Sequence, residues 1–148
     1  MRKYVGFLFA LVILCQPIQA DAYERQCPQT IEVTQQEAVE LMQIASAEAL
    51  NQGIDGMRYV MSVVINRVNS PDYPNDIHSV IYQPHQFYTA GMAKAEITPE
   101  VHMALALLEM GNLTPEIVAF ETVQSDALDV YYSEAFTSGN HKFYTVKH

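Results

Sequence analysis

The spacing of apolar residues predicts a first helix from Gln36 to Asn51. Within this range, the apolar residues that recur at helical spacing are Leu41, Ile44 and Ala45. Thr34 is a good helix N-cap, and Glu37 stands three residues later, where its carboxylate completes a capping box. We therefore assign Glu37 a structural role, and we expect Gly53 to end the helix.

A second helix is expected to begin after Gly56 and to end before Ser70. Its apolar face consists of Met57, Val60, Met61, Val64 and Val68. Asn66 and Arg67 also lie on this helix, and we expect their side chains to hold a neighbouring loop. Farther along, one or two short helical turns are indicated by Ile77, Val80 and Ile81.

A third long helix is expected after Thr98, with Pro99 at its first position and Gly111 just past its end. The residues expected to pack it against the core are Met103, Ala104, Leu107 and Leu108. Three short strands follow, predicted at residues 117–120, 130–132 and 142–146. Helices followed by a small sheet, with no internal repeat or linker, indicate a single α+β domain.

The first residues of the chain, 1–20, have the pattern of a secretory signal peptide. Two basic residues precede an apolar run that ends at Leu14, and small residues offer cleavage sites at Ala20 or Ala22. The run is too short to span a bilayer comfortably, so we expect no stable membrane insertion after cleavage. The sequence thus predicts a secreted or periplasmic protein of the cell envelope.

Cleavage after Ala20 leaves 128 residues, which is enough for one ordinary domain. We interpret residues 21–33 as a leader segment and residues 34–148 as the domain. Cys27 is then the only cysteine, so an internal disulfide is excluded and stability must come from an apolar core. Cys27 itself is either free or bridged to another molecule.

The charge of the chain argues against nucleic acid as a partner. Removal of the signal leaves six basic residues against seventeen acidic ones, a formal net charge of −11. Such a surface repels phosphate backbones and anionic lipids, whereas it suits a neutral, mixed-charge or cationic substrate. The histidines show no spacing typical of metal ligands, so we expect no metal site.

Glu48 is the strongest candidate for a chemical role. At about 100° per residue, it falls on the apolar stripe of the first helix, four residues after Ile44. Burial disfavours a charged carboxylate, so a Glu in this position holds its proton to higher pH, as a general acid must. The alternative is a Glu that extends from the edge of the stripe to solvent or bonds a nearby backbone group.

Four segments together resemble the bacterial cell-wall hydrolase family that includes the spore-cortex-lytic enzymes. They are Ser46-Ala47-Glu48-Ala49, Val63-Val64-Ile65-Asn66-Arg67-Val68, Val80-Ile81-Tyr82-Gln83-Pro84-His85-Gln86-Phe87 and Gly139-Asn140-His141-Lys142-Phe143-Tyr144. Their order and spacing follow the family pattern from about Glu37 to Tyr144. Each segment alone is a weak signal, and the joint order makes the resemblance fairly specific.

The resemblance implies a mainly helical, lysozyme-like domain with a small antiparallel sheet towards the C-terminus. It implies cleavage of peptidoglycan glycan strands, usually as a lytic transglycosylase, with Glu48 as the single general acid and base and with no metal or cofactor. The residues that it suggests for substrate binding are Gln83, Gln86, Phe87, Asn140, His141 and Tyr144.

Structural roles remain open for all of these binding candidates. The amide side chains can tie down loop backbone, the aromatic rings can belong to the core, and His141 can be part of the cleft wall. The chain also departs from the family pattern, because residues 116–138 are rich in acids and contain no Trp. A noncatalytic descendant that binds cell-wall glycan or a protein is therefore the alternative to an enzyme.

Overall fold

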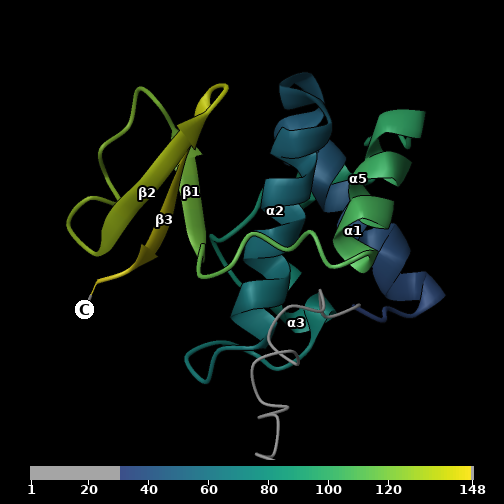
Figure 1. Cartoon of the computed structure of the whole chain (residues 1–148), viewed down its shortest axis with the longest axis horizontal. Helices are drawn as coiled ribbons and strands as arrows, with labels where there is room; N and C mark the ends of the chain where they lie inside the picture. Colours follow the sequence, from purple (N-terminus) through teal and green to yellow (C-terminus); the bar gives the residue numbers. More distant parts are fainter. Residues whose placement is uncertain (1–30, 148) are drawn as a thin grey trace, which may run out of the picture.

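The computed structural model describes residues 31–147. Its helices are α1 (Gln35–Ala49), the 3-10 helix η3 (Leu50–Gln52), α2 (Gly53–Val68), α3 (Ile77–Ile81), α4 (Thr89–Met92) and α5 (Pro99–Glu109). Its strands are β1 (Ala119–Thr122), β2 (Tyr132–Ser138) and β3 (His141–Val146). Figure 1 shows the helices on one side of the molecule and the sheet on the other, which confirms the predicted α+β class.

The N-terminal prediction lies largely outside the described residues. This holds for the signal peptide, for Cys27 and for most of the leader segment. The last leader residues do belong to the folded body, because Ile31 and Val33 pack against the helical core and the Ile31 N–H donates to the Glu109 carbonyl at 3.3 Å. None of the helices within residues 31–147 is long and apolar enough to cross a membrane.

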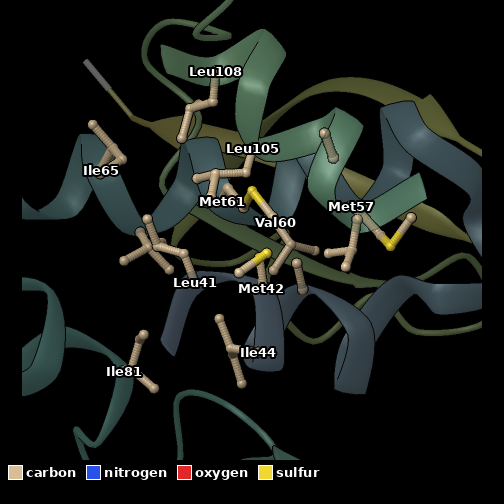
Figure 2. Packing of buried hydrophobic residues seen from close by; sticks show 14 of the residues in the cluster. Leu41, Met42, Ile44, Met57, Val60, Met61, Ile65, Ile81, Leu105 and Leu108 are labelled. Atoms are coloured by element: carbon tan, nitrogen blue, oxygen red, sulfur yellow. The ribbon is translucent and has the colours of Figure 1, made fainter. Parts of the chain in front are cut away.

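The core lies between α1, α2 and α5 (Figure 2). Its fully buried side chains include Leu41, Ile44, Met57, Val60, Met61 and Leu108. Ala104 and Leu108 of α5 face this core as predicted, but Met103 is 53% exposed and Leu107 is only partly buried. The buried stripe of α5 runs through Val101 and Leu105 instead, at the i, i+3, i+4, i+7 spacing that Met103 does not share.

The capping box at the start of α1 is confirmed. The Thr34 N–H donates to the Glu37 carboxylate at 2.8 Å, and the Glu37 N–H donates to the Thr34 hydroxyl at 3.3 Å. The far end of α1 differs from the prediction, because the helix ends at Ala49 and η3 follows it. Gly53 has a φ of 69° and is the first residue of α2, so it marks the reversal between two helices.

The sheet is antiparallel with the order β1-β3-β2. The third predicted strand is confirmed with one extra residue, and the first lies two residues later than predicted. The second prediction was misplaced: β2 begins at Tyr132, and Val130 and Tyr131 are exposed loop residues. β2 gave a weak pattern because most of its residues are exposed and a bulge interrupts its pairing between Glu134 and Phe136.

Side chains of α2 attach the sheet to the helices. The Asn66 amide donates to the carbonyls of Thr114 and Ile117 at 2.9 and 2.8 Å. The buried Arg67 donates from Nε to the Val118 carbonyl at 2.6 Å. These bonds confirm that both residues hold a neighbouring loop, and that loop leads directly into β1.

Candidate active site

Glu48 lies in the last turn of α1 with its carboxylate half-buried. The Tyr88 N–H donates to Glu48 Oε1 at 2.6 Å, although the two residues are 40 positions apart. Burial raises the pKa of the Glu48 carboxyl above its usual value, and the hydrogen bond from Tyr88 acts in the opposite direction. The direction of this pKa shift is the one that a general acid requires.

The backbone around Tyr88 is positioned by Arg67. The Arg67 guanidinium carbon lies 5.1 Å from the centre of the Phe87 ring and 5.0 Å from the centre of the Tyr73 ring. Arg67 is itself held by α2 and by the Val118 carbonyl. The segment that contacts Glu48 is thus also held by a buried cation that lies over the rings of Tyr73 and Phe87.

A cavity of about 470 Å³ opens next to Glu48. Its lining residues are Glu48, His85, Gln86, Phe87, Tyr88, Phe120, Glu121, Thr122 and His141. Gln86, Phe87 and His141 come from the two segments that the sequence singled out, so the fold brings members of both beside Glu48. A second cavity of about 550 Å³, between residues 31–33 and the end of α2, contains none of these groups.

Three of the predicted binding residues do not line this cavity. Gln83 lies partly buried away from it, and its Oε1 atom has no hydrogen-bond partner within residues 31–147. The Asn140 side chain is exposed, while the Asn140 N–H donates to Gln52 Oε1 at 2.7 Å. Substrate binding by Gln83 and Asn140 therefore stays a prediction.

Tyr144 is also absent from the cavity lining, so its role in substrate binding stays a prediction. The side chain is fully buried, and its hydroxyl lies 2.6 Å from a Glu121 oxygen and 2.8 Å from an Asp129 oxygen. Successive side chains of a strand point to opposite faces of the sheet. His141 and Phe143 of β3 face the helices, so Tyr144 faces away from them, beneath the loop of residues 123–131.

His141 forms part of the cavity wall as a neutral imidazole. Its ring centre lies 5.2 Å from that of Phe120, and the residue is buried. Burial lowers the pKa of the imidazole, so the neutral form predominates near pH 7. Nδ1 has no hydrogen-bond partner within the described part of the chain. His141 therefore offers an uncharged polar group beside Glu48.

Glu121 of β1 lines the cavity, but alternation along the strand places its carboxylate on the other face of the sheet, with Tyr144, and the sequence patterns did not predict this residue. Burial alone would raise its pKa, but hydrogen bonds from Ser125 Oγ, from the Tyr144 hydroxyl and from the Leu128 N–H hold the pKa below the usual value. Its oxygens are thus occupied by protein donors, and it stays ionised. The lowered pKa of Glu121 therefore belongs to a structural anion on the face of the sheet that also carries Tyr144.

β1 contributes backbone groups to the cavity as well as side chains. It is an edge strand, and Phe120 to Thr122 line the cavity. The Val123 N–H donates to the Asn140 carbonyl at 2.9 Å, which sets the alternation of the antiparallel ladder. The N–H and C=O of Phe120 consequently point away from β3, where they are available to a bound molecule.

The arrangement of groups around Glu48 can support proton transfer by this acid. Within residues 31–147, no group of three or more His, Cys, Asp or Glu residues is placed to hold a metal ion. Glu48 supplies a titratable proton, the Tyr88 N–H fixes one carboxylate oxygen, and polar groups of His141, Gln86 and β1 surround the space in front of it.

Comparison with known proteins identifies relatives for most of the chain. The sequence pattern of the cell wall hydrolase family matches residues 51–144, a range that begins just after Glu48. A spore cortex-lytic enzyme from Halalkalibacterium halodurans is 31% identical over 75 residues. That alignment covers 50% of this chain but only 23% of the relative.

Two solved structures share the fold. The catalytic domain of the Bacillus cereus SleB protein superposes with a TM-score of 0.60 at 21% identity, over 78% of this chain and 95% of that domain. The catalytic domain of the germination-specific lytic transglycosylase SleB from Bacillus anthracis gives a TM-score of 0.62 at 19% identity, over 76% and 97%. The arrangement of helices and C-terminal sheet is therefore one that these catalytic domains also adopt.

Proposed function

Because the chain belongs to the cell wall hydrolase family, we propose that it cleaves the glycan strands of peptidoglycan as a lytic transglycosylase. The observation that carries the proposal is Glu48, a half-buried acid with a raised pKa that lines a cavity of about 470 Å³. The related SleB domain named as a lytic transglycosylase supports this type of reaction.

In this reaction, Glu48 acts first as an acid and then as a base. Its carboxyl proton passes to the oxygen of the glycosidic bond as the bond between that oxygen and the anomeric carbon breaks. The N-acetyl group of the substrate stabilises the anomeric carbon. The 6-hydroxyl oxygen of the same muramyl residue then bonds to that carbon, and its proton returns to Glu48. The products are one glycan fragment that ends in an anhydro-muramyl residue and a second fragment whose new terminal hydroxyl carries the proton donated by Glu48.

The surroundings of Glu48 suit a group that is alternately protonated and ionised. The Tyr88 N–H occupies only Oε1, so Oε2 is left for the proton. The same N–H stabilises the carboxylate that forms after the proton leaves, because hydrogen bonds to charged acceptors are strong. Glu121 does not act as a second catalytic carboxylate in this scheme, since three protein donors already bind its oxygens.

The proposed place of action is the cell envelope outside the cytoplasmic membrane. This follows from the location of peptidoglycan and from the signal pattern of residues 1–20. Export of the full chain from a bacterial host, followed by mass measurement of the secreted form, tests it. The expected masses correspond to cleavage after Ala20 or Ala22, and a full-length protein retained in the cytoplasm would contradict the proposal.

Digestion of purified peptidoglycan, with mass spectrometry of the products, tests the activity. Anhydro-muramyl ends identify a lytic transglycosylase, and reducing ends identify a hydrolase of the same bond. A folded protein that releases no products, but that sediments with the glycan, would instead be the noncatalytic binder.

A further inference from the structure

The side chain of Tyr88 forms an exposed aromatic surface at the edge of the Glu48 cavity. Tyr88 is 63% exposed and lines the cavity, while its N–H holds the Glu48 carboxylate. One residue thus provides the backbone donor for the acid and an aromatic ring close to it. Large aromatic side chains stabilise a fold by burial, and this ring contributes little in that way.

The ring of Tyr88 is supported by Gly91 in α4. A Cβ atom added at Gly91 would lie 2.7 and 2.8 Å from Cδ1 and Cε1 of Tyr88, and 3.3 Å from the Cβ of Ala47. Gly91 does not have a positive φ, so the backbone conformation does not require glycine. Alanine also favours helices over glycine by about 1 kcal/mol. The need for glycine here is one of space, because the Tyr88 ring lies directly against the helix.

No phenylalanine of the cavity is exposed in this manner. Phe87 and Phe120 are partly buried, with ring centres 6.1 Å apart. His141 is buried against Phe120. Tyr131 is a comparably exposed tyrosine, at 70%, but it lies in the loop before β2 and does not line the cavity. Tyr88 therefore combines an exposed ring, a place in the cavity lining and a glycine against which the ring lies.

We propose that the Tyr88 ring is the platform on which a sugar ring of the glycan strand stacks, next to the bond that Glu48 protonates. An exposed aromatic face attracts the apolar C–H face of a pyranose, and the phenol hydroxyl remains in water. Because the Tyr88 backbone also holds Glu48, a sugar on this platform lies at a set position relative to the acid. The inference rests on the proposed function and assigns the substrate contact that the sequence motifs did not include.

The test measures binding without turnover. Insoluble peptidoglycan is sedimented with Glu48→Gln, and the apparent Kd is compared with that of Glu48→Gln/Tyr88→Ala. Loss of the ring is expected to weaken binding about 3- to 10-fold, the range of a single aromatic contact. Glu48→Gln/Tyr88→Phe keeps the ring and should bind within about twofold of Glu48→Gln. Glu48→Gln/Tyr131→Ala is the matched control for an exposed tyrosine and should bind like Glu48→Gln.

Gly91→Ala gives an independent test, since it displaces the ring without removing it. In the Glu48→Gln background it should weaken binding as much as Tyr88→Ala, and the two changes together should weaken it no further. Circular dichroism and melting temperature confirm that each variant is folded. Equal binding with and without the Tyr88 ring, or normal binding by Gly91→Ala, would overturn the inference.

These outcomes are separable from failure of the proposed function. If wild-type protein releases no products while binding still depends on Tyr88, the catalytic proposal fails and the platform stands. If wild-type protein is active but binding ignores Tyr88, the platform fails alone. Absence of any glycan binding by Glu48→Gln overturns the platform as well.

Discussion

Replacement of Glu48 by Gln tests whether the raised pKa serves catalysis. The change removes the transferable proton while it keeps the shape of the side chain and an oxygen that can accept the Tyr88 N–H. Activity on peptidoglycan should fall by about 10²–10⁴-fold, the usual contribution of a positioned general acid or base. In transition-state terms this is about 2.7–5.4 kcal/mol.

The structure also predicts how this variant affects stability. The bond from the Tyr88 N–H weakens, because it loses a charged acceptor, at a cost of about 1 kcal/mol. Removal of the half-buried charge acts in the opposite direction, so the net change in the free energy of unfolding should stay within about 1 kcal/mol. A core residue of similar size would cost more when altered.

The pH dependence of this stability difference has a definite sign. Burial raises the pKa of Glu48 in the folded state above its unfolded value. Its protonated form therefore stabilises the fold below the unfolded pKa, and this contribution is lost as the pH rises through the folded pKa. Glu48→Gln does not lose stability in this way, because its amide does not ionise. Its melting temperature relative to wild type should be higher at pH 7 than at pH 4.

Turnover and melting temperature should be measured on the same preparations. Glu96→Gln is the matched control, because Glu96 is exposed and lies outside the cavity while the charge change is identical. A folded Glu48→Gln variant with near-normal activity would refute the reasoning. So would activity that falls only in proportion to the unfolded fraction, since that pattern indicates a structural Glu.

Three further expectations follow from the same contacts. The kcat/KM on glycan fragments should decline as the pH rises through the raised pKa of Glu48, and a Glu48 that is ionised across the whole active range would contradict the acid role. Tyr144→Phe should lower the free energy of unfolding in urea by about 1–3 kcal/mol, because the Glu121 and Asp129 carboxylates lose a donor. The control Tyr131→Phe should leave it unchanged, since Tyr131 is exposed. An altered KM at unchanged stability would instead support a place for Tyr144 in the binding site. EDTA or reductant should leave the melting temperature unchanged, and a large drop would reveal a metal or disulfide.

Local patterns were sufficient for the existence of the three long helices and for the place of Glu48 on the first of them, but they did not predict the short helix α4. The capping box depends on two residues in one turn, and the apolar stripe that carries Glu48 repeats within a single helix. Such features are encoded by neighbours in sequence, so period and residue type reveal them. Periodicity was insufficient on α5, where apolar residues occupy more than one stripe and only packing selects Val101 and Leu105 over Met103 and Leu107.

The strands were harder to place because their signal depends on their partners. β2 exposes most of its side chains, so its own hydrophobicity does not reveal where it lies. Its position is set by its pairing with β3 and by the turn at Gly139. Tyr144 and His141 belong to the same segment and were predicted to act together. The register of β3 sends them to opposite faces of the sheet, one beneath the outer loop and the other into the cavity.

The place of Glu48 on an apolar face is thus a property of one helix, whereas its environment is a property of the whole fold. Sequence periodicity places Glu48 on an apolar face, and elementary electrostatics then gives the direction of its pKa shift. The Tyr88 N–H, the Glu121 carboxylate and the space beside Gly91 acquire meaning only once distant segments meet. Hydrogen bonds and steric contacts act over a few ångströms in space, and a linear sequence records no such distances.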